Sequence, residues 1–201
     1  LKTMNRSERG FQLVELVIVL ALFALLAGLT APPIFRISGQ LRLRQAAEEL
    51  VGVMRLARSI AVNRCANVAV RFRPRADGHA TYSLYRDADG DGVLTKDIDR
   101  GIDPQVAPPK RLEQIGNQVR FGFPPGRLAR DPASPKKWLR NGDDPIRFNN
   151  SNLASFSPLG TAAPGTVFLT DGQRNLAAVR VTGRTGRVKV VVYDFEEEVW
   201  K

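Results

Sequence analysis

The pattern of hydrophobic and polar positions begins with a long apolar segment. Residues 16–35 form a run of 20 residues without a formal charge. A helix needs about 20 predominantly apolar residues to cross the hydrocarbon core of a bilayer. The run therefore predicts a membrane-spanning helix, and we expect Pro32 and Pro33 to trim or kink its end.

The helical period continues beyond this run as an amphipathic pattern. In residues 39–64, apolar side chains recur at spacings of three and four, while arginine and glutamate fall on the other faces. This pattern predicts a continuation of the same helix, with one face packed against a sheet. We expect Cys65, just beyond it, to be a small buried hydrophobe. The positions expected to be buried are Leu43, Ala46, Ala47, Leu50, Val53, Met54, Ala57, Ile60 and Ala61.

From residue 66 the hydrophobic period changes to two, which is typical of strands. Val68, Val70 and Phe72 alternate with small or charged residues until Pro74 stops the pattern. A turn signal follows, and residues 81–86 then read as a second strand. The two segments together predict a β-hairpin.

The remainder of the chain alternates between short strand patterns and segments rich in Asp, Gly and Pro. Residues 87–118 and 124–145 predict long loops, and the acidic segment 196–201 is expected to fray. Further strands are expected at residues 119–123, 146–148, 155–157, 166–170, 176–182 and 188–193.

The order of these elements, one long helix followed by strands, indicates an α+β fold. We expect a long N-terminal hydrophobic spine helix, first transmembrane and then amphipathic, packed on a mostly antiparallel β domain. The expected parts are a leader at residues 1–10, the apolar helix at 11–35, its amphipathic half at 36–65 and the β domain at 66–201.

One charged residue is out of place in the apolar segment. Glu15 lies one position before the uncharged run. A carboxylate at the centre of a bilayer costs about 2.5–3.5 kcal/mol on insertion scales and less near an end, so such a residue usually has a partner. Cleavage after Gly10 would create one, the α-amine of Phe11, four residues from Glu15. The alternatives are an ordinary signal anchor and a secretory signal peptide with a poor cleavage site at 29–31.

The arrangement of Gly10, Phe11 and Glu15, behind a leader with three basic residues, resembles the type IV prepilin signal. The resemblance implies that a prepilin peptidase cuts between Gly10 and Phe11 and that Phe11 is N-methylated. It also implies that Glu15 helps to dock the subunit against the amine of a neighbour. The apolar helix would anchor the chain in the inner membrane, with its C-terminal domain in the periplasm, and would later form the core of a filament.

Several short motifs contain glycine or arginine at characteristic positions. They are Phe156-Ser-Pro-Leu-Gly160, the strand Gly165-Thr-Val-Phe-Leu169 and Gly183-Arg-Thr-Gly186-Arg187, together with Arg55-Leu-Ala-Arg58 on the helix. These motifs resemble the GspH/FimT group of minor pilins and pseudopilins. The resemblance implies a pilin-like fold. It also implies a structural subunit at or near the tip of a type II secretion pseudopilus or type IV pilus, which initiates or caps assembly. The implied partners are other pilins or pseudopilins, the prepilin peptidase and the inner-membrane assembly platform.

A second function exists in the same group, since some FimT-type subunits bind DNA for uptake through a Gly-Arg-x-Arg motif. The matching positions are Gly186-Arg187-Val188-Lys189, with Arg184 just upstream. Lysine can contact a phosphate but lacks the bidentate fork of arginine. Removal of the leader lowers the net charge of the chain from +10 by two, to +8, which favours anionic partners. The alternative is a tight hairpin with exposed charges. Tyr193 is the one aromatic residue that accompanies these cations in the pattern, so the sequence gives little support for stacking of single-stranded bases.

An acidic segment raises the question of a metal. Asp87-Ala-Asp89-Gly-Asp91-Gly92 matches the first half of an EF-hand calcium loop. The twelfth position should be Glu but is Ile98, with Asp97 and Asp99 on either side. Two interpretations stay open: a solvated Asp/Gly turn, which the missing ligand favours, and a calcium loop closed by a different residue. We expect no other cofactor.

The sequence argues against an enzyme. It contains one histidine, His79, and one cysteine, Cys65, far apart in the pattern, which does not suggest a nucleophile with its base. The glycine-rich segment 183–186 lacks the Lys-Ser/Thr ending of a phosphate-binding loop. A single cysteine also excludes a disulfide within the chain.

Overall fold

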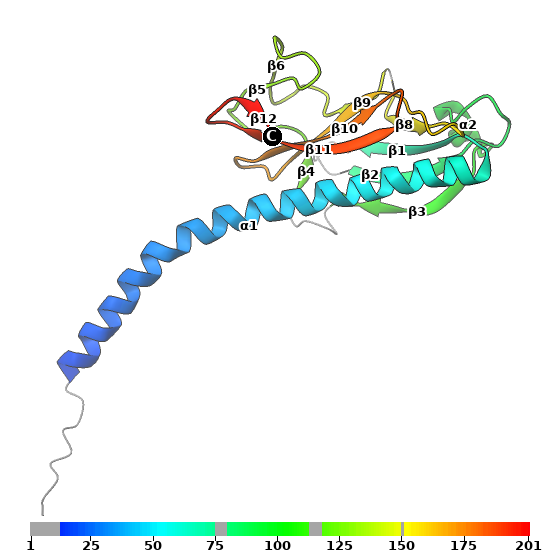
Figure 1. Cartoon of the computed structure of the whole chain (residues 1–201). Coiled ribbons are helices and arrows are strands. Elements are labelled where there is room, and N and C mark those ends of the chain that lie inside the picture. Colours follow the sequence, from blue (N-terminus) through cyan, green and yellow to red (C-terminus); the bar gives the residue numbers. More distant parts are fainter. Residues whose placement is uncertain (1–12, 75–79, 113–117, 150) are drawn as a thin grey trace, which may run out of the picture. The chain divides into compact units, whose positions relative to one another are not determined.

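The computed structural model describes residues 13–74, 80–112, 118–149 and 151–201 (Figure 1). The predicted leader lies outside the described residues, as do the cleavage position Gly10/Phe11 and His79. The chain divides into two units between Ser38 and Gly39. Helix α1 (Leu13–Arg64) contributes its beginning to the first unit and its end to the second.

In the first unit, α1 is a helix whose large apolar side chains are exposed. Between Leu13 and Leu26 they range from 37% exposure at Val19 to 78% at Leu13. The helix continues past Pro32 and Pro33, so the expectation that these prolines trim its end was wrong. We also expected a membrane-spanning helix over residues 11–35. Within the residues that the structure describes, no helix combines the length and the apolarity needed to cross a bilayer.

In the second unit, α1 is amphipathic as predicted, because its apolar positions are buried against the sheets. Leu43, Leu50 and Met54 are at most 1% exposed. Four buried alanines, Ala46, Ala47, Ala57 and Ala61, lie on the same face, and their small side chains let the helix approach the strands closely. The prediction for Cys65 was wrong: its side chain is exposed, because it lies past the last helical turn at a φ of 50°.

The first sheet has the strand order β3-β2-β1-β8, with each neighbouring pair antiparallel. The predicted hairpin is confirmed, since β1 and β2 pair from Val68↔Arg86 to Pro74↔Ala80. Its strands are β1 (Val68–Pro74), β2 (Ala80–Arg86), β3 (Gln105–Arg111) and β8 (Leu153–Phe156).

The second sheet has the order β12-β11-β10-β9-β4, and β7 also pairs with β9. A separate two-stranded sheet consists of β5 and β6. The strands are β4 (Arg120–Phe121), β5 (Ala129–Arg130), β6 (Trp138–Leu139), β7 (Ile146–Arg147), β9 (Gly165–Thr170), β10 (Leu176–Thr182), β11 (Arg187–Asp194) and β12 (Val199–Trp200).

The main core lies between α1 and the inner faces of both sheets. Val68, Val70 and Phe72 point into it, as the alternation predicted, and the Phe72 ring stacks on Phe148 with a centroid distance of 6.1 Å. The result is a mixed α/β fold with antiparallel sheets. In the second unit of the chain, α1 runs along one side of the strands (Figure 1).

Each sheet has a second apolar cluster on its outer face. On the first sheet, Tyr85 and Ala69 contact Val93 and Ile98 of the segment around α2 (Thr95–Arg100). On the second sheet, Phe168, Leu176 and Tyr193 contact Ala129 and Leu139 of the β5–β6 insert. The segments expected as long loops therefore cover the outer faces of the two sheets.

Three sequence predictions were wrong in this region. Residues 87–118 contain α2 and β3, and β3 tolerates two prolines because it is an edge strand. Residues 124–145 contain β5 and β6, which are too short for a periodic signal. The acidic tail does not fray, because β12 pairs with β11 and the Trp200 indole N–H donates a 2.7 Å hydrogen bond to the Arg130 carbonyl.

Candidate functional site

Three motifs that are distant in sequence meet at one junction. The Arg58 side chain of α1 donates from Nε to the carbonyl oxygen of Gly160, at 2.9 Å across 102 positions. Gly186, in the turn between β10 and β11, lies against both groups. A Cβ on Gly186 would overlap the Gly160 oxygen and would lie 2.9 Å from Arg58 Nε.

Both glycines at this junction are required by conformation as well as by space. Gly160 has a φ of 76° and Gly186 a φ of 57°, in the left-handed region that side chains rarely adopt. A Cβ on Gly160 would lie 3.0 Å from Arg58 Nη2. The three motifs therefore fasten the helix, the loop after β8 and the β10–β11 hairpin together. The sequence signal was present, but the contact among the motifs could not be read from it.

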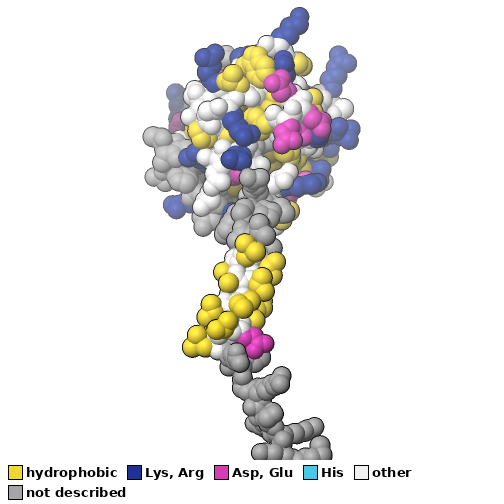
Figure 2. Space-filling view, turned by 90° about the vertical axis from the view of Figure 1, so that its left-hand side faces the viewer, with side chains coloured by type: hydrophobic (Ala, Val, Ile, Leu, Met, Phe, Trp, Pro, Cys, Tyr) yellow, Lys and Arg dark blue, Asp and Glu magenta, His cyan; other side chains and the backbone are white. Residues whose placement is uncertain are grey.

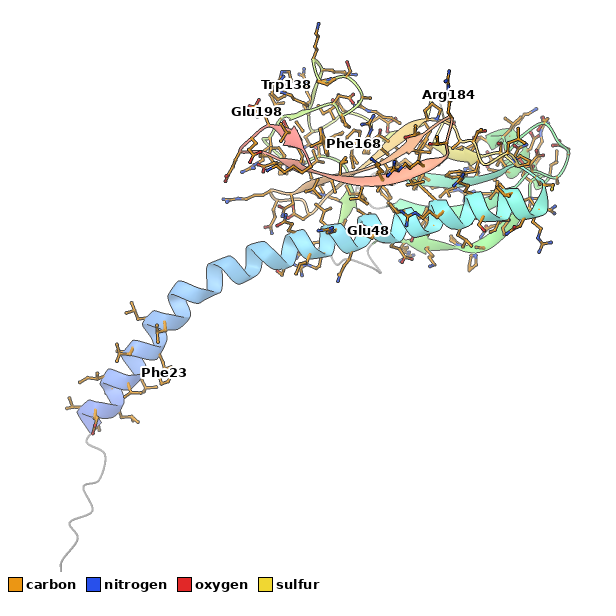
Figure 3. The ribbon with its side chains drawn as sticks, in the orientation of Figure 1. Phe23, Glu48, Trp138, Phe168, Arg184 and Glu198 are labelled. Atoms are coloured by element: carbon orange, nitrogen blue, oxygen red, sulfur yellow. The ribbon has the colours of Figure 1, made fainter. Side chains whose placement is uncertain are left out.

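The β10–β11 hairpin also carries the predicted DNA-binding residues. Arg184 lies at its tip, where its side chain points away from the sheet (Figure 3), and Arg187 and Lys189 follow on β11. All three side chains are exposed. Arg187 and Lys189 share the outer face of the sheet, because the intervening Val188 points into the main core.

The cations on this hairpin are close together and have no acidic partners in the described part of the chain. Lys189 pairs across the strands with Arg180, so that two like charges lie directly opposite each other. Arginines elsewhere differ. Arg147 lies 3.1 Å from Asp131, and Arg130 lies 3.0 Å from Glu198. Tyr193 does not offer a stacking surface, because its side chain is buried.

The acidic segment after β2 forms a tight loop around Asp87. Its carboxylate accepts hydrogen bonds from the N–H groups of Gly90 (2.7 Å) and Gly92 (3.0 Å) and from Asn67 Nδ2 (2.8 Å). Burial raises the pKa of the Asp87 carboxyl, but these hydrogen bonds more than offset burial and leave the pKa below its usual value. The structure also brings the oxygens of Asp87, Asp89 and Asp91 within 4.8 Å of one another.

The structure separates the two candidates for closing this loop. Asp97 is buried, and its Oδ2 atom has no hydrogen-bond partner among the described residues. Asp99 is exposed and forms an ion pair with Arg71 at 2.7 Å. Sequence reasoning missed Asp103, a buried carboxylate that accepts from the N–H groups of Ala88 (3.3 Å) and Leu94 (3.2 Å). No metal pattern includes Asp103, so only the fold could place it here.

The last candidate surface is the described beginning of α1. Glu15 is exposed, and the large apolar residues that follow it are exposed as well. Figure 2 shows hydrophobic side chains along the viewed side of this segment. Glu15 has no acidic or basic partner within the described residues. An apolar helix surface of this extent calls for a covering, either lipid or other chains.

Comparison with known proteins gives a family and a related structure. The family model described as "Type II transport protein GspH" matches residues 46–186. This range includes the three residues that meet at the junction, Arg58, Gly160 and Gly186. Among solved structures, the chain is similar to the minor pseudopilin EpsH from the type 2 secretion system of Vibrio cholerae. The match has 11% sequence identity and a TM-score of 0.45, and covers 74% of this chain and 94% of EpsH. A search of curated proteins found no match.

Proposed function

The chain belongs to the family of type II transport protein GspH, and from this premise we propose that it is a minor pseudopilin. In this proposal it is a structural subunit at or near the tip of a type II secretion pseudopilus, where it initiates or caps assembly. Its partners are other pseudopilins and the inner-membrane assembly platform. It performs no catalysis.

The observation that supports this role is the exposed apolar surface at the beginning of α1. Large side chains at every turn between Leu13 and Leu26 are exposed to solvent in the isolated chain. At about 25 cal/mol per Å² of apolar surface, a helix with such residues gains much from burial in lipid or among other helices. A chain with this helix on a folded domain suits a subunit that waits in a membrane and then packs into a filament.

Glu15 has a specific task in this proposal. Cleavage between Gly10 and Phe11 leaves the N-methylated amine of Phe11 near one end of an apolar helix. A carboxylate among apolar surfaces needs an opposite charge, and the amine of a neighbouring subunit supplies it. In this proposal the helix with the uncharged run at 16–35 lies in the inner membrane before assembly, and the domain lies in the periplasm.

The experiment compares Glu15→Ala with Glu48→Ala in the native host. Glu48 is an exposed glutamate on the same helix but in the second unit, so its loss changes the charge equally. Glu15→Ala is expected to reach the membrane in normal amount and to be processed, yet to lose chemical cross-links to other pseudopilins and to abolish secretion. Glu48→Ala is expected to behave as wild type. Normal cross-linking and secretion by Glu15→Ala would contradict the proposal.

A second function rests on a different observation, the cationic hairpin without acidic partners. As a FimT-like minor pilin, the chain would bind DNA for uptake through Arg184, Arg187 and Lys189. Unpaired exposed cations release the counterions of DNA phosphates, and this binding is independent of base sequence.

A salt titration of the full-length chain in detergent with unrelated DNA duplexes tests this function. Three phosphate contacts give a log–log slope of about −2.7, and each charge removed flattens the slope by about one unit. Arg187→Ala and Lys189→Ala are expected to show this change, whereas Arg130→Ala, which removes an ion-paired arginine, keeps the slope. Undetectable binding at low salt would exclude DNA as a partner. An unchanged slope in both hairpin variants would move the contact to the arginine-rich stretch 120–147.

A further inference from the structure

The segment 87–103 concentrates buried negative charge. Among the described residues, the buried charged side chains are Asp87, Asp97, Asp103 and Asp131. Asp131 has a partner, since Arg147 Nη1 lies 3.1 Å from it. The other three lie together in this one segment. Charged side chains are almost never buried without a counter-charge, so the group as a whole lacks positive charge.

The lysine beside these carboxylates, Lys96, does not balance their negative charge. Lys96 Nζ lies 3.6 Å from Asp91 Oδ2 and 3.7 Å from Asp97 Oδ2, and 58% of its side chain is exposed. Both distances exceed hydrogen-bond length. One ammonium group therefore stands against the four carboxylates of Asp87, Asp89, Asp91 and Asp97.

We propose that this loop is a calcium site, in which Asp87, Asp89 and Asp91 bind the ion from one side and Asp97 closes it. The first three carboxylates already lie within 4.8 Å of one another. Asp87 Oδ1 accepts a hydrogen bond from the N–H group of Gly90, which orients this carboxylate in the loop. Gly92 has a φ of 96°, which permits the sharp turn that brings the loop back on itself.

Asp97 is the observation that points to a ligand. Its carboxylate is buried with only 3% of the side chain exposed, and Oδ2 has no hydrogen-bond donor among the described residues. Lys96 Nζ lies within 4 Å of both Asp91 Oδ2 and Asp97 Oδ2, so these two oxygens are near the same ammonium group. A buried, unsatisfied carboxylate oxygen costs free energy that a cation would recover. Asp99, the other sequence candidate, is held by Arg71 instead.

The chemistry of the donors selects calcium over other common metals. All four donors are hard carboxylate oxygens, without the His or Cys ligands that zinc and copper prefer. Asp89 and Asp91 are exposed, so water can complete the six to eight ligands that calcium takes. Magnesium demands a stricter octahedron and dehydrates reluctantly, which suits a loop with several protein ligands less well.

The ion would also stabilise the cover of the first sheet. Asp103 already links the two sides of the loop through the N–H groups of Ala88 and Leu94. Val93 and Ile98, which come from the same segment, contact Tyr85 on the outer face of the sheet. Calcium bound between Asp91 and Asp97 would fix α2 to this surface. Calcium is therefore expected to raise the melting temperature as well as to bind.

The experiment is a calcium titration of the full-length chain in detergent, after removal of metals with a chelator. Calorimetry is expected to give one site with a dissociation constant on the order of 10⁻⁴ M or tighter, and much weaker binding of magnesium. Calcium at about 1 mM is expected to raise the melting temperature, because it binds the native state only.

Four substitutions locate the site. Asp91→Asn, at an exposed position that leaves folding intact, and Asp97→Asn are each expected to weaken calcium binding by about tenfold or more. Asp99→Asn is the matched control with the same loss of charge and is expected to keep the wild-type affinity. Lys96→Gln removes the competing ammonium and is expected to bind calcium more tightly.

The outcomes separate a metal site from a solvated turn. Absence of both calcium heat and a calcium-dependent melting shift in the wild-type protein would overturn the proposal. Wild-type affinity in both Asp91→Asn and Asp97→Asn would overturn it as well, since the ion would then bind elsewhere. Equal affinity for magnesium would overturn the assignment of calcium. Tighter binding by Lys96→Gln would support the proposal, because a solvated turn that relies on the lysine would gain nothing from its loss.

Discussion

Substitution of Gly186 by alanine tests whether the three family motifs hold the domain together. Gly186 has a φ of 57°, and its added Cβ would overlap the Gly160 carbonyl, which belongs to the backbone and cannot rotate away. Movement of that carbonyl would also break its hydrogen bond with Arg58 Nε. The change therefore acts on the helix, the loop and the hairpin at once.

The expected cost has two parts. A left-handed conformation costs a residue with a side chain about 1–2 kcal/mol. Loss of a hydrogen bond from a charged donor costs about 1.5–3 kcal/mol. Gly186→Ala is thus expected to lower the free energy of unfolding by about 2.5–5 kcal/mol, which corresponds to a fall of roughly 10 °C in the melting temperature of a domain of this size.

Gly126 supplies the matched control. It has a φ of 67°, close to that of Gly186, but no atom lies within 4 Å of the position that a Cβ would take. Gly126→Ala is therefore expected to show the conformational cost alone, about 1–2 kcal/mol or roughly 4 °C. The difference between the two variants measures the contact with Gly160 and Arg58.

The assay is thermal unfolding of the full-length chain in detergent, followed by circular dichroism of the strands. In an Arg58→Ala background, Gly186→Ala is still expected to cost more than Gly126→Ala, because the overlap with the backbone carbonyl remains. Equal melting temperatures for Gly186→Ala and Gly126→Ala would refute the junction as a source of stability.

Two further predictions concern processing and pH. Gly10→Val is expected to block cleavage before Phe11, because a peptidase cleft suited to a bare backbone excludes a branched side chain; an immunoblot that shows full cleavage of the variant in host membranes would contradict this. The Lys201 ammonium, followed by the N–H groups of Glu196 and Glu197, lowers the pKa of Asp194 to about 2. A lowered pKa stabilises the folded state above the unfolded value of about 3.9, and this stability is lost as pH falls toward 2. Asp194→Asn is therefore expected to show a shallower loss of stability between about pH 4 and pH 2 than the wild-type chain.

The elements with a sustained period could be predicted from the sequence. The buried face of α1 from Leu43 to Ala61 and the alternation of Val68, Val70 and Phe72 both reflect burial of one continuous face in the main core, so each pattern is regular. β10 was also predicted with its observed bounds. The residues that form each of these patterns are neighbours in the sequence, so the patterns can be recognised without knowledge of the fold.

The covers of the two outer faces could not be predicted in the same way. α2 has six residues and β5 has two, which is too short for any period to appear. β3 contains Pro108 and Pro109, and only its place at the sheet edge makes it a strand. The exposure of Cys65 depends on where α1 ends, and helix ends are the least certain feature of a pattern.

The candidate calcium loop and the junction around Arg58 also contain one part that local sequence predicts and another that only the fold determines. Asp87, Asp89 and Asp91 form a contiguous motif, so the sequence alone brings them together. The choice of Asp97 over Asp99 depends on Arg71, which comes from β1. The meeting of Arg58, Gly160 and Gly186 depends on three elements far apart in the chain, and no local pattern contains that information.

The hydrogen bond from Trp200 to the Arg130 carbonyl sets an order of events for a chain that enters a compartment from its N-terminal side. The bond joins positions 70 residues apart, and the Trp200 ring also lies 4.9 Å from Tyr193 and 6.1 Å from Phe168. The β5–β6 insert emerges long before Trp200 does, and closure of so long a loop is slow. Until Trp200 arrives, the aromatic cluster under the insert stays partly open to water and to chaperones. The outer face of the second sheet is therefore expected to be the last part of the domain to complete its packing.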